Sequence, residues 1–386
     1  MRPDLTGIVR AGDGILIGQA CAEPQTLVEA LAEQRAAFSG AQVFLGVNYS
    51  GILRPEHADH LRLSAYCGSG HNRALAEAGV LDIHPHPYSR LGSLIRRKTI
   101  PSDVVLIQVS PPNARDEYSM GLAADYLVPA VENARAVVAE VNDRVPWTNT
   151  ERVFRREEFA LLVPSSREPA PAPATKVGDI ERDVAKHAAT FVPDRATLEF
   201  GLGALPDAVC AALKGRKGLA VHSGTIGDGV ADLLAEGAVG NVTAAMLIGS
   251  RKLFDAAHEN PAIRLRSVEY THDPRVLAGI ERFVALNSAV EVDLTGQVNA
   301  EVARDSYLGA VGGALDFVRA ANQSPGGISL TLISASRIVE KLSGPVATPR
   351  SEAGVVVTER GTADLRGCTL AERKRRMRAI SRLWAT

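Results

Sequence analysis

The residues best suited to chemistry lie in the second half of the chain, around Glu291. Val290, Val292 and Leu294 alternate there with Glu291 and Asp293, and a period of two predicts a strand that carries both carboxylates on one face. A carboxylate can act as a covalent nucleophile. An edge strand with a solvated acidic face gives the same pattern, so both interpretations stay open at this point.

A glycine-rich segment follows at residues 309–319. It opens with Gly309, Gly312 and Gly313 and continues into an apolar stretch. Glycines let backbone N–H groups come close to a reacting carbonyl, as an oxyanion site requires. The alternative is a tight turn before a helix.

A second glycine-rich turn occupies residues 201–207. Gly201 and Gly203 are predicted to end a strand, and Pro206 fits the first turn of a helix over 207–214. Such a turn can hold a phosphate or carboxylate through its backbone N–H groups, or it can be an ordinary strand-to-helix connection. Pro206 occupies the last glycine position of the dinucleotide-binding fingerprint, which disfavours a nicotinamide oxidoreductase.

Alternating elements are expected to position these segments. Short β-branched stretches alternate with stretches of helical length, such as 26–37 and 120–130, which predicts βαβ units and mainly parallel sheets in an α/β protein. The predicted strands are residues 15–18, 42–47, 104–110, 136–141, 197–202, 218–222, 244–248, 282–286, 290–294, 328–333 and 354–358.

Two domains are predicted, because 386 residues exceed one ordinary hydrophobic core. A Pro/Ala-rich stretch at 164–175 is typical of an extended linker, so we expect an N-terminal domain over 1–175 and a C-terminal domain over 176–386. The order strand, glycine turn, proline, helix and strand recurs in both halves, which agrees with two related open α/β domains.

Composition narrows the class of protein. Charges nearly balance, with 43 Lys and Arg against 44 Asp and Glu, so a nucleic-acid backbone is not an expected partner. The chain shows no run of about 18 apolar residues, and its four cysteines form no C-x-x-C pair. We therefore expect a cytoplasmic protein without a membrane segment, a disulfide framework or a metal site.

Several ordered segments resemble the acetyl-CoA hydrolase/transferase family, which includes 4-hydroxybutyrate CoA-transferases, and the resemblance spans nearly the whole chain. The strongest segments are GLGALPDAV (201–209), HSGTIGDGVADL (222–233), LNSAVEVDLTGQVNAE (286–301), GAVGGALDFVRAA (309–321), SRIV (336–339) and ATPRSEAGVVVTERGTADLRG (347–367).

The resemblance implies two related α/β domains with the active site at their interface. It assigns Glu291 as the catalytic glutamate and Gly312 and Gly313 as backbone donors at the thioester. CoA or substrate contacts are expected from Gly201, Gly203, Gly309, Val311 and Asn299. The implied partners are acyl-CoA and small carboxylic acids, with coenzyme A as substrate and product, no permanently bound cofactor, and a homodimer or homotetramer.

The implied reaction is a ping-pong transfer of CoA from an acyl-CoA to a carboxylic acid. Glu291 forms a glutamyl anhydride and then a glutamyl-CoA thioester. An acyl-CoA hydrolase would use the same glutamate and discharge it with water. A non-catalytic protein that binds CoA esters is a further alternative.

The chain departs from the family at three places. Relatives often carry an acidic residue where this chain has Gly224, and a longer loop where this chain has only four residues around Ser334. Relatives also continue beyond the position of Trp384. These departures bear on the substrate pocket, so specificity is not transferred from the relatives.

Overall fold

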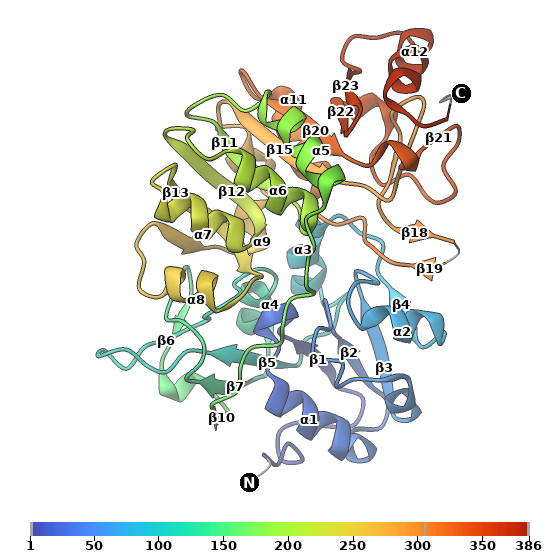
Figure 1. Cartoon of the computed structure of the whole chain (residues 1–386). Helices are drawn as coiled ribbons and strands as arrows, with labels where there is room; N and C mark the ends of the chain where they lie inside the picture. Colours follow the sequence, from blue (N-terminus) through green and yellow to red (C-terminus); the bar gives the residue numbers. More distant parts are fainter. Residues whose placement is uncertain (1–2, 305, 384–386) are drawn as a thin grey trace. The chain divides into compact units, whose positions relative to one another are not determined.

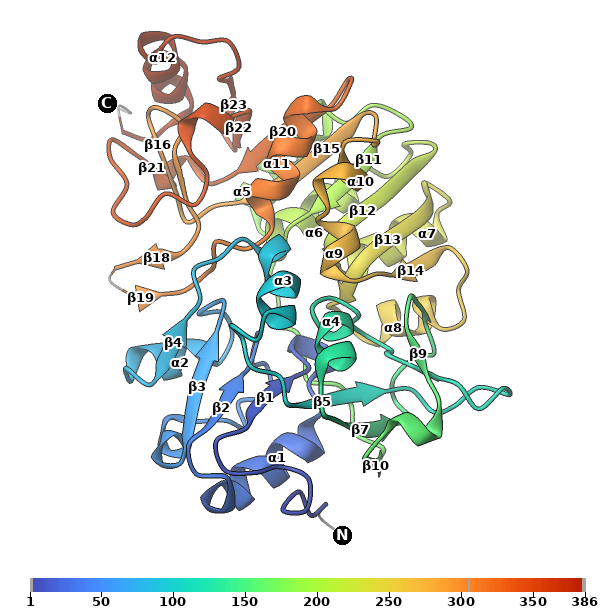
Figure 2. The same ribbon diagram turned by 180° about the vertical axis from the view of Figure 1, so that it is seen from behind.

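The computed structural model describes residues 3–304 and 306–383 (Figures 1 and 2). Two compact units divide the chain. The first comprises Met1–Pro173 and Ala245–Tyr270, and the second comprises Ala174–Ala244 and Thr271–Thr386. The chain first leaves the first unit after Pro173, within the stretch 164–175 predicted as a linker. The segment Ala245–Tyr270 then belongs with the first unit, although it lies inside the linear range 176–386.

A parallel sheet forms the centre of the first unit, and its strand order is β10-β7-β5-β1-β2-β3-β4. Pro164 lies in the edge strand β10, where a missing N–H is tolerated. The strands are β1 (Gly14–Ile17), β2 (Ala41–Phe44), β3 (Leu61–Ala65), β4 (Leu81–Ile83), β5 (Val104–Val109), β7 (Ala136–Asn142) and β10 (Leu161–Ser165).

Helices and short strand pairs complete the first unit. Apolar side chains of β1, β2, β3, β5 and α1 form one continuous core, because central strands of a parallel sheet are covered on both faces. The remaining elements are α1 (Gln25–Gln34), α2 (Asn72–Glu77), α3 (Leu91–Arg96), α4 (Leu127–Asn133), α8 (Arg251–Ala257), β6 (Tyr118–Ser119), β8 (Asn149–Thr150), β9 (Val153–Phe154) and β14 (Ile263–Leu265).

In the second unit the strands of the other large sheet lie in the order β23-β22-β20-β15-β11-β12-β13. The strands from β12 through β11, β15 and β20 to β22 run parallel to one another, and β23 pairs antiparallel with β22. The strands are β11 (Thr197–Phe200), β12 (Leu219–Ile226), β13 (Val239–Leu247, which continues into the first unit), β15 (Phe283–Ser288), β20 (Ile328–Leu332), β22 (Val355–Thr358) and β23 (Gly361–Asp364).

Helices lie on both faces of this second sheet. Figure 1 shows α5, α6 and α7 in front of it, and Figure 2 shows α10 and α11 on the opposite face. The helices are α5 (Asp179–Ala189), α6 (Ala204–Ala212), α7 (Asp228–Ala235), α10 (Pro274–Leu277), α11 (Ala314–Gln323) and α12 (Leu370–Ile380), and α9 (Val268–Thr271) spans the boundary between units.

Short strands beyond β15 carry the segment around Glu291. β16 (Glu291–Asp293) pairs antiparallel with β17 (Val298–Asn299) and parallel with β21 (Ile338–Val339). A hairpin of β18 (Val302–Ala303) and β19 (Ser306–Tyr307) follows.

The two units repeat one topology. The order β7-β5-β1-β2-β3 in the first corresponds to β20-β15-β11-β12-β13 in the second. In each unit the first strand is central, and the chain builds outward from it in both directions. The predicted α/β class with related, mainly parallel sheets is confirmed.

Most predicted strands are confirmed, and two predicted helices were misplaced. Residues 120–126 are not helical, because Gly121 has φ +65° and the Ala124 N–H bonds to the Ala245 carbonyl; α4 begins only at Leu127. The helix expected over 207–214 begins earlier, at Ala204, because Gly203 serves as its N-cap.

Leu198→Ala tests the core of the second unit. Leu198 lies on the central strand β11 and is fully buried, so truncation leaves a cavity and should lower the free energy of unfolding by about 2–5 kcal/mol. Leu202→Ala is the matched control, because that side chain is 44% exposed, and its cost should stay within about 0.5 kcal/mol. Urea unfolding followed by circular dichroism measures both; equal costs would contradict the assigned core.

Candidate active site

The strands β11 and β15 are neighbours in the middle of the second sheet, and their carboxyl ends lie side by side at one edge of it. After β11 the chain continues to β12 on one side of this strand pair, and after β15 it continues to β20 on the other side. The edge between β11 and β15 is therefore a topological switch point. Ligands of open α/β sheets bind at such points. Gly201 follows β11 here and donates its N–H to the Leu286 carbonyl at 3.0 Å.

Gly201 and Gly203 have different backbone roles. A Cβ at Gly201 would only reach ordinary contact with Asn287, at 3.6 Å. Gly203 has φ +112°, a conformation that side-chain-bearing residues rarely adopt, and it caps α6. The predicted strand–turn–helix arrangement is therefore present, with both glycines at the switch point.

Glu291 begins β16 and is half-buried. Its Oε2 accepts hydrogen bonds from the Ser343 N–H at 2.9 Å and from Asn299 Nδ2 at 3.4 Å. The Ser343 hydroxyl lies 2.8 Å from Oε1 and 2.9 Å from Oε2, and its single proton can serve one of them at a time. Oε1 therefore has a lone pair left for a ligand.

These neighbours set the protonation of Glu291. Partial burial acts to raise its pKa, but the hydrogen bonds from Ser343 and Asn299 and the charge of Arg337 outweigh it, so the pKa is lowered. The carboxylate is ionised at neutral pH. Sequence reasoning assigned no role to Ser343 or to Arg337, although Arg337 lies in the segment 336–339 that resembles the family.

Asp293, the second carboxylate of the strand, has a structural role. It is 4% exposed and accepts hydrogen bonds from the backbone and side chains of Thr295 and Gln297. It thereby closes the turn between β16 and β17. The predicted acidic face thus divides into one buried turn anchor and one accessible carboxylate, Glu291.

Asn299 links Glu291 to the hairpin that follows. It is fully buried, and its Nδ2 also donates to the Val302 carbonyl at 2.7 Å. Its Oδ1 accepts from the N–H groups of Glu301 and Val302. With its amide used internally, Asn299 is suited to hold Glu291 and the hairpin in place rather than to contact a ligand.

The glycine loop, residues 309–313, starts beside this hairpin. The N–H of Gly309 donates to the Glu301 carbonyl, and a Cβ at Gly309 would lie 2.0 Å from the Ala300 carbonyl oxygen. Val311 is half-buried, and Gly312 has φ +62°. The loop ends at Gly313, the N-cap of α11. The predicted bend before a helix is confirmed, and glycine is sterically required at Gly309.

His272 joins the glycine loop to Gly224, a contact that the sequence did not indicate. A Cβ at Gly313 would lie 2.4 Å from His272 Nε2, and a Cβ at Gly224 would lie 3.2 Å from its Cε1. The imidazole also packs on Phe317 of α11, with ring centroids 4.5 Å apart. Position 224 is therefore next to the glycine loop.

The shortened segment around Ser334 lies close to the Glu291 strand. Ser334 caps a short 3-10 helix, Ala335–Arg337, by accepting the Ser336 N–H. β21 starts immediately afterwards and pairs with β16. The compact loop thus brings Arg337 towards Glu291. The third predicted departure, at Trp384, lies outside the described residues.

Glu199 is a buried acid at the switch point. It is 2% exposed and accepts a hydrogen bond from Asn287 Nδ2 at 2.7 Å. Burial raises its pKa to about 8, and the hydrogen bonds from Asn287 and the Leu286 backbone offset only part of this effect. Glu199 is therefore protonated at neutral pH, in contrast to Glu291.

Polar strand ends in the first unit are internally satisfied. Gln108 and Asn142 are buried and bonded to each other at 2.8 Å, and Gln108 also donates to the Cys21 carbonyl. Ser110 bonds within its own loop. These three side chains stabilise the carboxyl edge of the first sheet.

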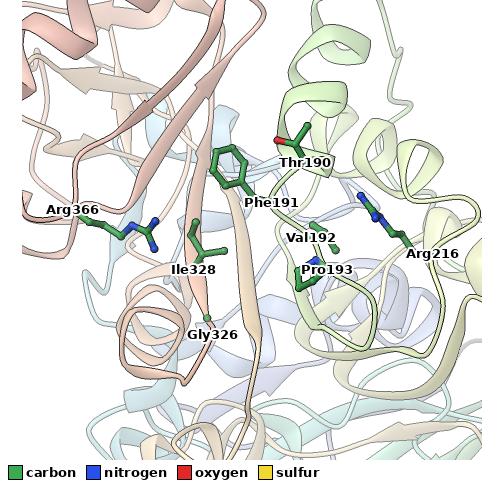
Figure 3. A pocket seen from close by; sticks show the side chains of 9 residues that line it. Thr190, Phe191, Val192, Pro193, Arg216, Gly326, Ile328 and Arg366 are labelled. Atoms are coloured by element: carbon green, nitrogen blue, oxygen red, sulfur yellow. The ribbon is translucent and has the colours of Figure 1, made fainter.

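A separate hollow lies at the amino ends of β11 and β20 (Figure 3). Its guanidinium groups are already engaged, Arg366 with Asp364 and Arg216 with the Ala189 carbonyl. Its volume is about 410 Å³, and it is lined by Thr190, Phe191, Val192, Pro193, Arg216, Gly326, Gly327, Ile328 and Arg366.

Fold and site together define an α/β protein with a duplicated parallel sheet and an ionised glutamate close to a glycine loop. The acetyl-CoA hydrolase/transferase N-terminal domain profile matches residues 2–158, and the corresponding C-terminal domain profile matches residues 249–382. The chain belongs to the acetyl-CoA hydrolase/transferase family.

Individual relatives match over nearly the whole chain. The 4-hydroxybutyrate coenzyme A transferase of Clostridium kluyveri is 34% identical over 381 residues, covering 94% of this chain and 89% of the relative. RipA of Yersinia pestis superposes with a TM-score of 0.92 at 27% identity, and a 4-hydroxybutyrate CoA-transferase of Porphyromonas gingivalis with 0.83 at 29%. Both alignments cover 98% of this chain and 92% of the solved chain.

Within residues 3–304 and 306–383, no helix has the length and apolar character needed to cross a membrane.

Glu199→Gln should change the pH dependence of stability. The glutamate of the unfolded chain ionises near its ordinary pKa of 4.5, whereas burial raises the pKa of the folded one to about 8. Stability from this group is therefore complete below pH 4.5 and is lost as pH rises towards 8. From about pH 5 to about pH 8 the wild type should lose about 3 kcal/mol more than the variant.

Urea titrations at both pH values measure this difference. Glu281→Gln is the control, because it makes the same substitution at an exposed position; a change in slope equal to that of Glu199→Gln would show that burial of Glu199 is not the cause. A wild-type slope equal to that of Glu199→Gln would mean that Glu199 is ionised in the folded protein.

Proposed function

We propose that this protein is a CoA-transferase that moves CoA from an acyl-CoA to a short or medium carboxylic acid. The observation that supports this most strongly is membership of the acetyl-CoA hydrolase/transferase family. The relative from Clostridium kluyveri is named as a 4-hydroxybutyrate coenzyme A transferase. The homodimeric or homotetrameric state and the cytoplasmic location stay predictions.

We propose Glu291 as the nucleophile. Its lowered pKa keeps it ionised, and Oε1 has a lone pair available for attack on the thioester carbonyl. Attack forms a glutamyl anhydride and expels CoA thiolate. The thiolate then attacks the glutamyl carbonyl, which releases the first acid and leaves glutamyl-CoA. The second acid reverses both steps, giving a new acyl-CoA and free Glu291.

The protein's other groups have supporting roles in this scheme. Ser343 and Asn299 fix the carboxylate, and a carboxylate held in place reacts with less loss of orientational freedom. Gly312 and Gly313 are proposed to present N–H groups to the developing oxyanion. Gly201, Gly203, Gly309 and Val311 are proposed to border the CoA ester.

Two alternatives use the same site. Water in place of the second acid would make the protein an acyl-CoA hydrolase. A CoA-ester-binding protein without turnover is favoured by one observation: position 224, next to the glycine loop, carries no carboxylate. In that case Glu291 would only hold the loop at Ser343 in place, and its hydrogen bonds to Ser343 are equally compatible with this role.

Intact-mass spectrometry with an acyl-CoA panel tests the nucleophile. The wild type should form a CoA-sized covalent adduct that a carboxylic acid discharges, and Glu291→Ala should form none and lose at least about 10³-fold in turnover. Ser343→Ala is the matched control, because it removes the hydroxyl that bonds to Glu291 but keeps the carboxylate; it should retain the adduct.

Other outcomes of the mass-spectrometry experiment would support the alternative functions. Discharge by water alone indicates a hydrolase. An adduct that persists in Glu291→Ala excludes Glu291 as the nucleophile. If the wild type binds acyl-CoA but forms no adduct with any member of the panel, the protein is a CoA-ester-binding protein without turnover.

A further inference from the structure

The side chain of His272 fills the space between two segments that are far apart in the sequence. One is Gly224 in β12 and the other is Gly313 at the end of the glycine loop, and both approach the Nε2 end of the ring. A Cβ on Gly224 would lie 3.2 Å from Cε1 of the ring, and a Cβ on Gly313 would lie 2.4 Å from Nε2, so the ring packs directly on both backbones. A side chain at Gly313 would displace the ring, and one at Gly224 would press on it.

The ring itself is held firmly. Its Nδ1 lies 2.9 Å from the Thr271 hydroxyl, and the ring packs against Phe317 with the two ring planes tilted by 50°. Phe317 belongs to the core formed with Phe283, Ala285 and Leu277. His272 therefore connects the glycine loop to the rigid core beneath it.

We propose that His272 is a positioning residue that fixes the glycine loop, and that glycine at 224 and 313 is what gives its ring room to do so. This inference deepens the proposed function and rests on it, since it matters for catalysis only if the loop binds the reacting thioester. Glycine at 224 is then an adaptation to the imidazole beside it.

The imidazole holds the loop through packing and not through charge. Burial, together with the nearby His222, lowers the pKa of His272 to about 3, so the ring is neutral at neutral pH. A neutral ring adds no charge beside a developing oxyanion. Its removal leaves a space next to Gly313, into which the loop can move.

Two opposite substitutions test the proposal. His272→Ala opens the space beside Gly313, and Gly224→Ala crowds the Cε1–Nε2 edge of the ring. Both should speed hydrogen exchange of a peptide covering 306–316 by about tenfold or more. Both should lower kcat by about 10–100-fold with KM within about threefold, because displaced donors affect the transition state most.

Matched controls separate positioning from general destabilisation. Gly240→Ala places a methyl group in a strand where nothing lies within 4 Å. His187→Ala removes an imidazole that bonds to the Thr358 carbonyl elsewhere in the unit. Either control can lower overall stability, but both should leave exchange in 306–316 and kcat unchanged.

Hydrogen exchange tests the positioning role and turnover tests the proposed function, so either claim can fail without the other. Unchanged exchange of 306–316 in both His272→Ala and Gly224→Ala would overturn the positioning role, whatever the activity. Faster exchange in a protein whose wild type turns over no acyl-CoA would uphold the positioning role and reject the proposed function. If His272→Ala does not fold, Gly224→Ala alone decides.

Discussion

The site depends on the buried amide of Asn299. Its four hydrogen bonds join the carboxylate of Glu291 to the backbone of residues 301 and 302. The Glu301 carbonyl in turn accepts the N–H groups at the start of the glycine loop. An unsatisfied buried amide is costly, so each of these partners is strongly favoured. Gly344 leaves room for Asn299, because a Cβ there would lie 2.6 Å from its Nδ2.

The parallel sheet provides the frame around this network. In both units the first strand is central, and its carboxyl end faces a switch point between strands that continue in opposite directions. In the second unit this edge holds Gly201, Asn287 and Glu199, and the chain reaches Glu291 four residues after Asn287. The same topology in the first unit carries a satisfied pair, Gln108 and Asn142.

Neighbouring ionisable groups are held in opposite states by their surroundings. Hydrogen-bond donors lower the pKa of Glu291 and keep it ionised, whereas enclosure raises the pKa of Glu199, which keeps its proton. His272 is neutral for the same reason as Glu199, since burial disfavours the charged form. The second unit therefore concentrates reactive charge on Glu291, while its buried groups act through shape and hydrogen bonding.

The sequence by itself determined the α/β class, most strands, the strand at Glu291, both glycine turns and the family, because these follow from local periodicity, backbone chemistry and ordered motifs. It misplaced α4 and the start of α6, where single glycine conformations decide. Only the tertiary structure grouped Ala245–Tyr270 with the first unit, bonded Ser343 to Glu291, and set His272 between Gly224 and Gly313. Those outcomes depend on sheet register and on close packing of distant segments, which no local pattern encodes.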